Sequence, residues 1–208
     1  MKKNYKLFLT IASLVIYQSL LYLISKLTPI KTTILTSTID SLIPFIPYFI
    51  YFYIFWYVML FIVPYLLYKS DEEFFKRYFV STFISITIAG LIYIFFPTSI
   101  VRASINGSGI TNFIVKFIYL IDTPVMNCFP SMHCIISFLF IFSVIGCRNL
   151  SKKYKWVISI LSCLIVISTL LVKQHVVVDV ISGFIISSFV YFIVCKTKIW
   201  TFLKLKDL

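Results

Sequence analysis

The chain has 208 residues, of which 61% are hydrophobic and only 12% are charged. Because a soluble domain carries roughly 25% charged residues, this composition excludes an ordinary soluble fold and predicts an all-α integral membrane protein with a mostly lipid-covered surface. The formal net charge of +12 does not indicate nucleic-acid binding, because the basic residues are scattered in small groups between apolar runs and form no basic arm or stripe.

Six apolar runs are predicted to span the membrane as helices and to form one bundle, a single membrane domain over residues 1–208. In chain order they cover residues 7–25, 42–68, 78–96, 131–147, 156–172 and 175–195. A Thr/Ser-rich loop at 26–42 follows the first run, and a short charged connection at 69–77 follows the second. Only Lys173 and Gln174 join the last two runs, which requires an antiparallel helical hairpin.

A longer segment, residues 99–129, separates the third and fourth runs. It contains a turn-like Asn-Gly-Ser-Gly sequence and then a short apolar stretch at 112–121. Phe113, Phe117 and Leu120 recur there at helical spacing, so this stretch is predicted to be a short helix lying along the membrane interface.

The basic residues lie mostly on one side of this six-span arrangement. Fourteen of the nineteen Lys and Arg residues precede the first run or follow the second, fourth and sixth runs. The other five are Lys26, Lys31, Arg102, Lys116 and Lys173. The positive-inside rule therefore predicts a multi-pass protein of the plasma membrane, with cytoplasmic termini and an extracytoplasmic segment 99–129.

Aromatic residues crowd the beginning of the second run, between Tyr48 and Tyr57. Trp and Tyr prefer the membrane interface, so this density indicates helix ends, tilt or packing rather than chemistry. An aromatic box for a cationic ligand is the alternative interpretation.

The only two histidines of the chain, His133 and His175, are predicted to lie at the outer ends of the fourth and sixth runs, on the same membrane face. Asp179 follows His175 by four residues, so on a helix its carboxylate can accept a hydrogen bond from the ring. This bond would fix the tautomer and leave the other ring nitrogen as a nucleophile or base. Gly183, four residues further on, has no side chain and would allow another helix to pack closely against the same face. Ionisable groups at membrane depth are costly, which favours a functional site.

The start of the fourth run is a candidate anion site. Pro130 and Ser131 begin the helix, so its first free N–H groups point outward, and the Ser131 hydroxyl adds a donor. His133, within the first turn, could protonate a leaving oxygen bound there. Arg102 and Lys173 are the nearest bases on that side and could neutralise phosphate charge in the transition state.

Two motifs carry a family resemblance. Phe-Pro-Ser-Met-His at 129–133 and His175-x3-Asp179-x3-Gly183 resemble the second and third signatures of the phosphatidic acid phosphatase type 2 superfamily. The Lys-Gln-His form of the third signature is similar to a branch that includes lipid phosphotransferases. The resemblance covers residues 78–188, which it marks as the catalytic core.

The resemblance implies an integral-membrane lipid phosphatase or phosphotransferase that cleaves a phosphomonoester or diphosphate of a lipid through a phosphohistidine. It makes His175 the nucleophile, Asp179 the group that orients it and His133 the acid and base on the leaving group. Ser131 would bind the phosphate, and Arg102 matches the arginine of the first signature. The resemblance implies no metal and no other cofactor, and it implies membrane lipids rather than nucleic acid as partners.

The chain departs from the family signatures at three positions. Phe95 and Ala103 stand where the first signature has lysine and proline, and Thr169 stands where the third signature has a phosphate-binding arginine. Lys173 is the candidate substitute for that arginine. These departures bear on the substrate and the rate more than on the histidine chemistry.

Two other functions remain open. A transporter or lipid flippase could use the two histidines and Asp179 as a proton relay. The same three side chains also satisfy the ligand number of a catalytic zinc site. Within the enzyme reading, the lipid, the choice between hydrolysis and transfer to an acceptor alcohol, and the oligomeric state are undetermined.

Overall fold

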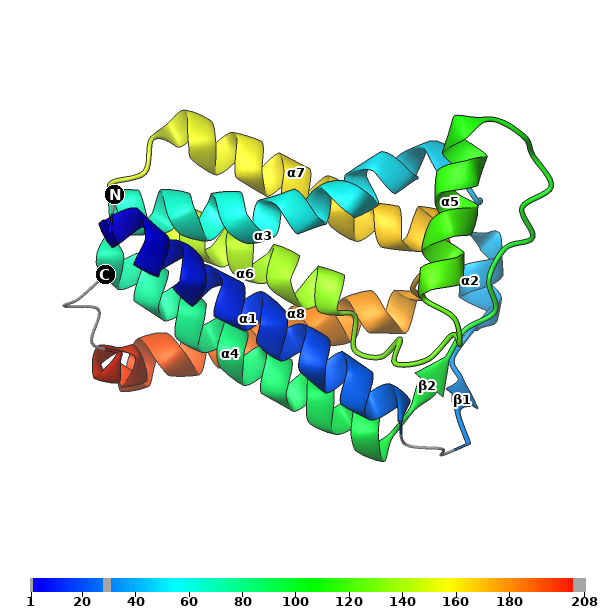
Figure 1. The fold of residues 1–208 in the computed structure, drawn as a ribbon, viewed down its shortest axis with the longest axis horizontal. Coiled ribbons are helices and arrows are strands. Elements are labelled where there is room, and N and C mark those ends of the chain that lie inside the picture. The colour runs from blue at the N-terminus through cyan, green and yellow to red at the C-terminus, as the bar shows by residue number, and fades with distance from the viewer. Residues whose placement is uncertain (1, 28–30, 204–208) are drawn as a thin grey trace.

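A computed structural model describes residues 2–27 and 31–203, with side chains described from Tyr5 onward. Helices α1, α3, α4, α6, α7 and α8 run along the long axis of a bundle, and α5 lies across one end of it (Figure 1). We call this end the α5 end. The helix bounds are α1 Lys2–Lys26, α2 Thr38–Leu42, α3 Ile50–Ser70, α4 Glu72–Phe95, α5 Ile110–Ile121, α6 Met132–Gly146, α7 Lys152–Leu171 and α8 Val177–Thr197, with 3₁₀ turns at Pro47–Phe49 and Ile199–Phe202.

Among the described residues, five helices are long and apolar enough to cross a membrane: α1, α3 with its preceding turn, α4, α7 and α8. They indicate a multi-pass membrane protein. Helix α6 has 15 residues and is therefore about 22 Å long, shorter than a hydrocarbon core of about 30 Å. Most of its side chains are buried, and it packs against α4, α7 and α8. Its place as a sixth span remains a prediction.

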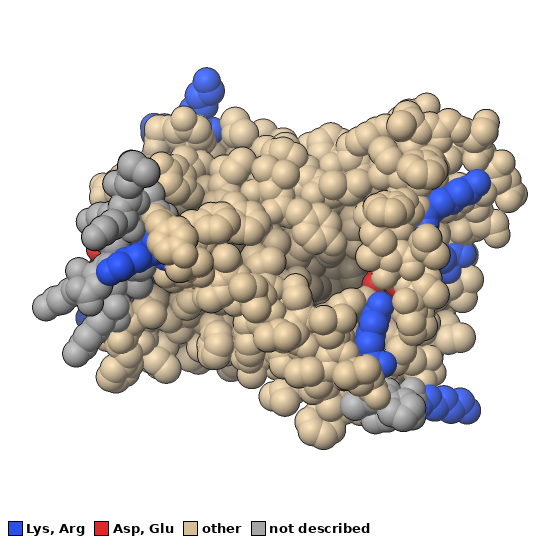
Figure 2. All heavy atoms as spheres, in the orientation of Figure 1, with Lys and Arg blue, Asp and Glu red and all other residues tan. Residues whose placement is uncertain are grey.

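At the α5 end, helices α1, α4 and α7 extend further than α6, whose first turn lies inside the bundle (Figure 1). The side chains of its first turn are therefore recessed. On the face shown in Figure 2, the visible charged side chains lie toward the two ends, and the surface is hollowed beside α5. Among the described residues, the middle of this face shows no charged side chain, which fits a lipid surrounding.

The second and third spans differ at their starts from the sequence-based boundaries. Residues 42–49 were predicted to open the second span, but α3 begins only at Ile50, because Pro44 and Pro47 lack the N–H groups that a continuous helix needs. Conversely, α4 already begins at Glu72, within the predicted charged connection. Asp71 caps it by accepting a hydrogen bond from the Glu73 N–H at 3.0 Å.

Two short strands, absent from the prediction, join distant parts of the chain. Strand β1, Thr33–Ile34, pairs in parallel with β2, Thr98–Ser99. The pairing continues through Val101, whose N–H donates to the Thr36 hydroxyl at 2.8 Å. The pair thereby anchors the segment that carries Arg102 at the α5 end.

Gly183 of α8 allows close contact with α6, as its position predicts. A Cβ atom at residue 183 would lie 2.8 Å from the Cys134 Cβ and 3.2 Å from the Ile135 backbone nitrogen. Any side chain there would push α8 away from α6. The glycine therefore sets the spacing of the two helices whose N-terminal ends carry the candidate site.

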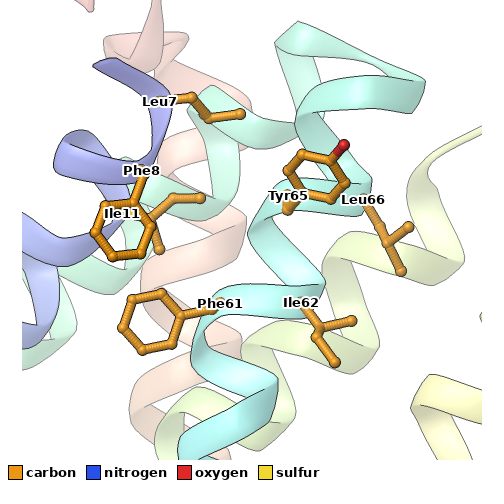
Figure 3. A pocket seen from close by; sticks show the side chains of 7 residues that line it. All are labelled: Leu7, Phe8, Ile11, Phe61, Ile62, Tyr65 and Leu66. Carbon is orange, nitrogen blue, oxygen red and sulfur yellow. The ribbon is translucent and has the colours of Figure 1, made fainter. Parts of the chain in front are cut away.

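An apolar groove of about 330 Å³ lies between α1 and α3 near the other end of the bundle. Figure 3 shows the side chains that line it, which are Leu7, Phe8, Ile11, Phe61, Ile62, Tyr65 and Leu66. Of the described residues, neither histidine and no charged residue lines it.

Candidate active site

His175 and Asp179 form the hydrogen-bonded pair that their spacing predicts. The ring Nδ1 lies 3.0 Å from Asp179 Oδ2, and the same oxygen accepts the Val176 N–H at 3.1 Å. Asp179 is fully buried in the first turn of α8. In the tautomer that this contact favours, Nδ1 donates to the carboxylate and Nε2 has the free lone pair.

His133 lies in the first turn of α6, next to the N-cap residue Ser131. The Ser131 hydroxyl accepts the Cys134 N–H at 3.3 Å and is itself fully buried. His133 as a residue is only 8% exposed, and its imidazole stacks on Tyr53 and Trp56 of α3. Within the described part of the chain, its Nε2 has no hydrogen-bond partner.

The two histidine rings come together although they are 42 positions apart in the chain. Their centroids are 6.1 Å apart. His133 enters from the start of α6 and His175 from the turn before α8, so the packing of these two helices creates the pair. The predicted convergence on one end of the bundle is therefore present in the geometry.

Arg102 is held by a network at the α5 end. Its guanidinium donates to the Tyr119 carbonyl at 2.9 Å, to the Gln174 side-chain oxygen at 2.7 Å and to the Asp122 carboxylate. Asp122 also accepts a hydrogen bond from Tyr22 of α1. The network therefore fixes Arg102 among α1, α5 and the hairpin that precedes His175.

Lys173 adopts a left-handed backbone conformation, with φ of 52°. Its ammonium donates to the carbonyls of Asp40 at 2.7 Å and Ile43 at 2.5 Å. These are carbonyls at the end of α2, where a cation is electrostatically favourable. In this structure Lys173 therefore joins the hairpin to α2.

A pocket of about 420 Å³ brings three of the predicted residues together. Arg102, Lys173 and His175 all line it, together with residues of the α2–α3 connection. Ser131 and His133 do not line this pocket. The pocket is thus lined by two basic side chains, one acidic side chain, that of Asp40, and the candidate nucleophile.

Asp40 is a site residue that the sequence did not single out. It is buried, and its carboxylate accepts the Val177 N–H at the start of α8, at 2.8 Å, and both the N–H and the hydroxyl of Ser37. Burial alone would raise the pKa of Asp40, but these hydrogen bonds and the charge of Lys173 together hold it below its usual value. The Ser37-x-x-Asp40 spacing of a capping box was the available signal.

Replacing Asp40 with asparagine is expected to lower the free energy of unfolding by about 1 kcal/mol at pH 7, because the cap of α8 is weakened. A depressed pKa means that this contribution is complete above about pH 4, the unfolded value, and is lost as the pH falls through the lower folded value. Thermal unfolding in detergent between pH 3 and pH 7 should therefore show the two proteins converging at low pH. Glu72→Gln, in a partly exposed pair with Lys76, is the control and should change stability by less than about 0.5 kcal/mol. A difference that widens toward low pH would contradict the assignment.

The zinc alternative lacks a ligand cluster. In residues 2–27 and 31–203, no three side chains of His, Cys, Asp or Glu come together in a way that could hold a metal ion. Asp179 directs Oδ2 at His175 and at a backbone N–H, and its Oδ1 is buried. The two histidines and this carboxylate therefore do not converge on one point.

A model of the PAP2 superfamily matches residues 31–193. The match spans most of the chain and includes all six predicted site residues, which are Arg102, Ser131, His133, Lys173, His175 and Asp179. No curated protein and no solved structure matches the chain.

Proposed function

The chain belongs to the PAP2 superfamily, and from this membership we propose that it cleaves a phosphomonoester or diphosphate of a membrane lipid through a phosphohistidine on His175. Phosphatase chemistry on phosphorylated lipids is general to this superfamily. The finer proposal rests on the pairing of His175 with the buried carboxylate of Asp179. A second histidine, His133, lies beside this pair, with 6.1 Å between the centroids of the two imidazole rings.

In the first half-reaction, Nε2 of His175 attacks phosphorus, and the N–P bond forms as the bond to the leaving oxygen breaks. His133 gives its proton to that oxygen. Asp179 orients the attacking ring and balances the positive charge that it acquires. In the second half-reaction, His133 takes a proton from water or from an acceptor alcohol, which attacks phosphorus and frees His175.

Positive charge for the phosphate oxygens would come from Arg102 and Lys173, which line the pocket beside His175. The N-terminal N–H groups of α6, with Ser131, would bind the phosphate from the other side. In this proposal residues 78–188 form the catalytic core. No step requires a metal ion, because the cationic side chains and the helix N–H groups neutralise the developing charge.

The proposed topology has six spans, with α6 as the short, enclosed one. Helix α1 begins and α8 ends at the end of the bundle opposite α5 (Figure 1). With the positive-inside rule this arrangement supports cytoplasmic termini and a site that opens at the extracytoplasmic face of the plasma membrane.

The test is phosphate release by the purified protein in detergent from a panel of phosphatidate, phosphatidylglycerol phosphate and polyprenyl diphosphate, with and without EDTA. We expect release from at least one lipid, equal in both conditions. Release that EDTA abolishes and zinc restores would overturn the metal-independent mechanism. If no lipid releases phosphate, labelled phosphate transfer to added acceptor alcohols distinguishes a phosphotransferase from a transporter, which would give neither product.

A further inference from the structure

The two histidines of the site are supported in different ways. His175 has a carboxylate at 3.0 Å, whereas no carboxylate of the described residues lies within ion-pair distance of His133. The titratable groups around His133 are Tyr53 and Tyr57 of α3, and His175 with its partner Asp179. From α4, Tyr93 directs its hydroxyl to the Pro130 carbonyl, just before α6. His133 is therefore a buried base without an acidic partner.

Aromatic rings occupy both faces of the His133 imidazole. Tyr53 and Trp56, three residues apart on one face of α3, stack on it with centroid distances of 4.2 and 4.1 Å and interplanar angles of 20° and 29°. Two rings at this distance and tilt would overlap each other if they shared one face, so they must lie on opposite faces. Tyr57 only meets the ring edge-on, at 6.0 Å.

This sandwich has an electrostatic consequence. The face of an aromatic ring carries partial negative charge and attracts a cation placed over it, most strongly for tryptophan. The protonated imidazole would therefore be stabilised from both faces, while the neutral ring would gain much less. Tyr53 and Trp56 are 6% and 1% exposed, so water screens the attraction little.

We propose that Tyr53 and Trp56 are positioning residues that fix the His133 ring and stabilise its protonated form, in the role that Asp179 has for His175. The inference rests on the proposed function of this site, in which His133 is the proton donor. Aromatic faces add no formal negative charge to a phosphate site. That matters here because Thr169 stands where the family signature has an arginine, so a second carboxylate would repel the substrate.

The test compares Trp56→Leu with Trp56→Phe, using the pH dependence of kcat on whichever lipid phosphate the panel identifies. Loss of the indole should lower kcat about 3- to 30-fold and change KM by less than about twofold. Because the protonated form is then less stable, the high-pH limb of the profile should move to lower pH by roughly 0.5–1 unit. Trp56→Phe, which retains an aromatic face, should recover most of both effects.

Tyr65→Leu is the matched control, since it removes an aromatic ring from the same helix, nine positions after Trp56, in the apolar groove between α1 and α3. Its pH profile should equal that of the unaltered protein. Should Trp56→Leu not fold, Tyr53→Leu and Tyr53→Phe make the same comparison from the opposite face.

A high-pH limb that stays in place in the leucine variants would overturn the inference, whatever the change in kcat. So would equal losses in the leucine and phenylalanine variants of Trp56 without any shift. His175→Ala separates this failure from that of the proposed function. If His175→Ala is inactive and the limb does not move, only the role of the sandwich fails. If His175→Ala retains full activity, both proposals fail.

Discussion

Replacing His175 with alanine is expected to lower kcat for phosphate release by at least about 10³-fold, because the proposed nucleophile is lost and no other group can take its place. In the described residues the only other imidazole is His133, which is held between two rings of α3. Release from the responsive lipid phosphate is the measurement. Brief mixing with ³²P-labelled substrate should also leave acid-labile label on the unaltered protein and none on the variant.

Asp179→Asn tests the partner of the nucleophile and is compared with His175→Ala. The amide keeps an acceptor for the Val176 N–H but loses the charge that faces Nδ1. We expect an intermediate loss of about 10²–10⁴-fold, since a neutral partner neither fixes the tautomer nor balances the charged ring. If His175→Ala retains more than a tenth of the activity, or still accumulates label, the nucleophile assignment is wrong.

The helices could be predicted because membrane helices have a strong local signal, a long apolar run. The errors in their boundaries arose where another local effect competes with hydropathy. Pro44 and Pro47 delay α3 to Ile50 although the residues around them are apolar, and Asp71 starts α4 inside a segment that looks like a polar loop. The pairing of β1 with β2 joins residues 65 positions apart and has no local signal in either short strand.

Part of the candidate site could also be predicted from a local sequence pattern. Helical spacing predicts the contact of His175 with Asp179, but His175 lies in the turn before α8, which begins at Val177. The contact therefore forms across the start of the helix, where Asp179 also accepts the Val176 N–H. The neighbours of His133 are different, because Tyr53 and Trp56 belong to a helix that is remote in the chain. Their aromatic character indicated an interface position, which is the commoner environment for such residues in membrane proteins. Only the packing of α3 near the start of α6 reveals the stacking.

The two predicted phosphate-binding bases turn out to be unequal. Lys173 gives hydrogen bonds to two backbone carbonyls of the α2 region, so its ammonium is largely satisfied within the protein. Arg102 also gives hydrogen bonds within the protein, to the Tyr119 carbonyl, the Gln174 side chain and the Asp122 carboxylate. In the described residues, however, its Nε has no hydrogen-bond partner, so the guanidinium keeps a donor that we expect a phosphate group to use.

Arg102→Ala is therefore expected to reduce kcat/KM by about 10²–10³-fold, the effect of removing a donor that stabilises transition-state charge. Arg102→Lys should recover little of this loss, because an ammonium cannot reproduce the two-pronged donation of a guanidinium. Steady-state kinetics on the responsive lipid is the measurement. Asp122 would retain Tyr22 and Lys26 as partners in both variants, so the α5 end should stay folded, and unchanged thermal unfolding in detergent would verify this.

Lys173→Ala supplies the comparison that decides between the two bases. If Lys173 mainly anchors the hairpin to α2, its removal should cost less than about tenfold in kcat/KM and appear chiefly as a lower melting temperature. A loss as large as that of Arg102→Ala, with unchanged melting, would instead mean that the ammonium leaves the carbonyls of Asp40 and Ile43 when phosphate binds. Lys173 would then be the substitute for the arginine that the family signature has at position 169. The positive charge of the site would in that case be assembled only in the complex with substrate.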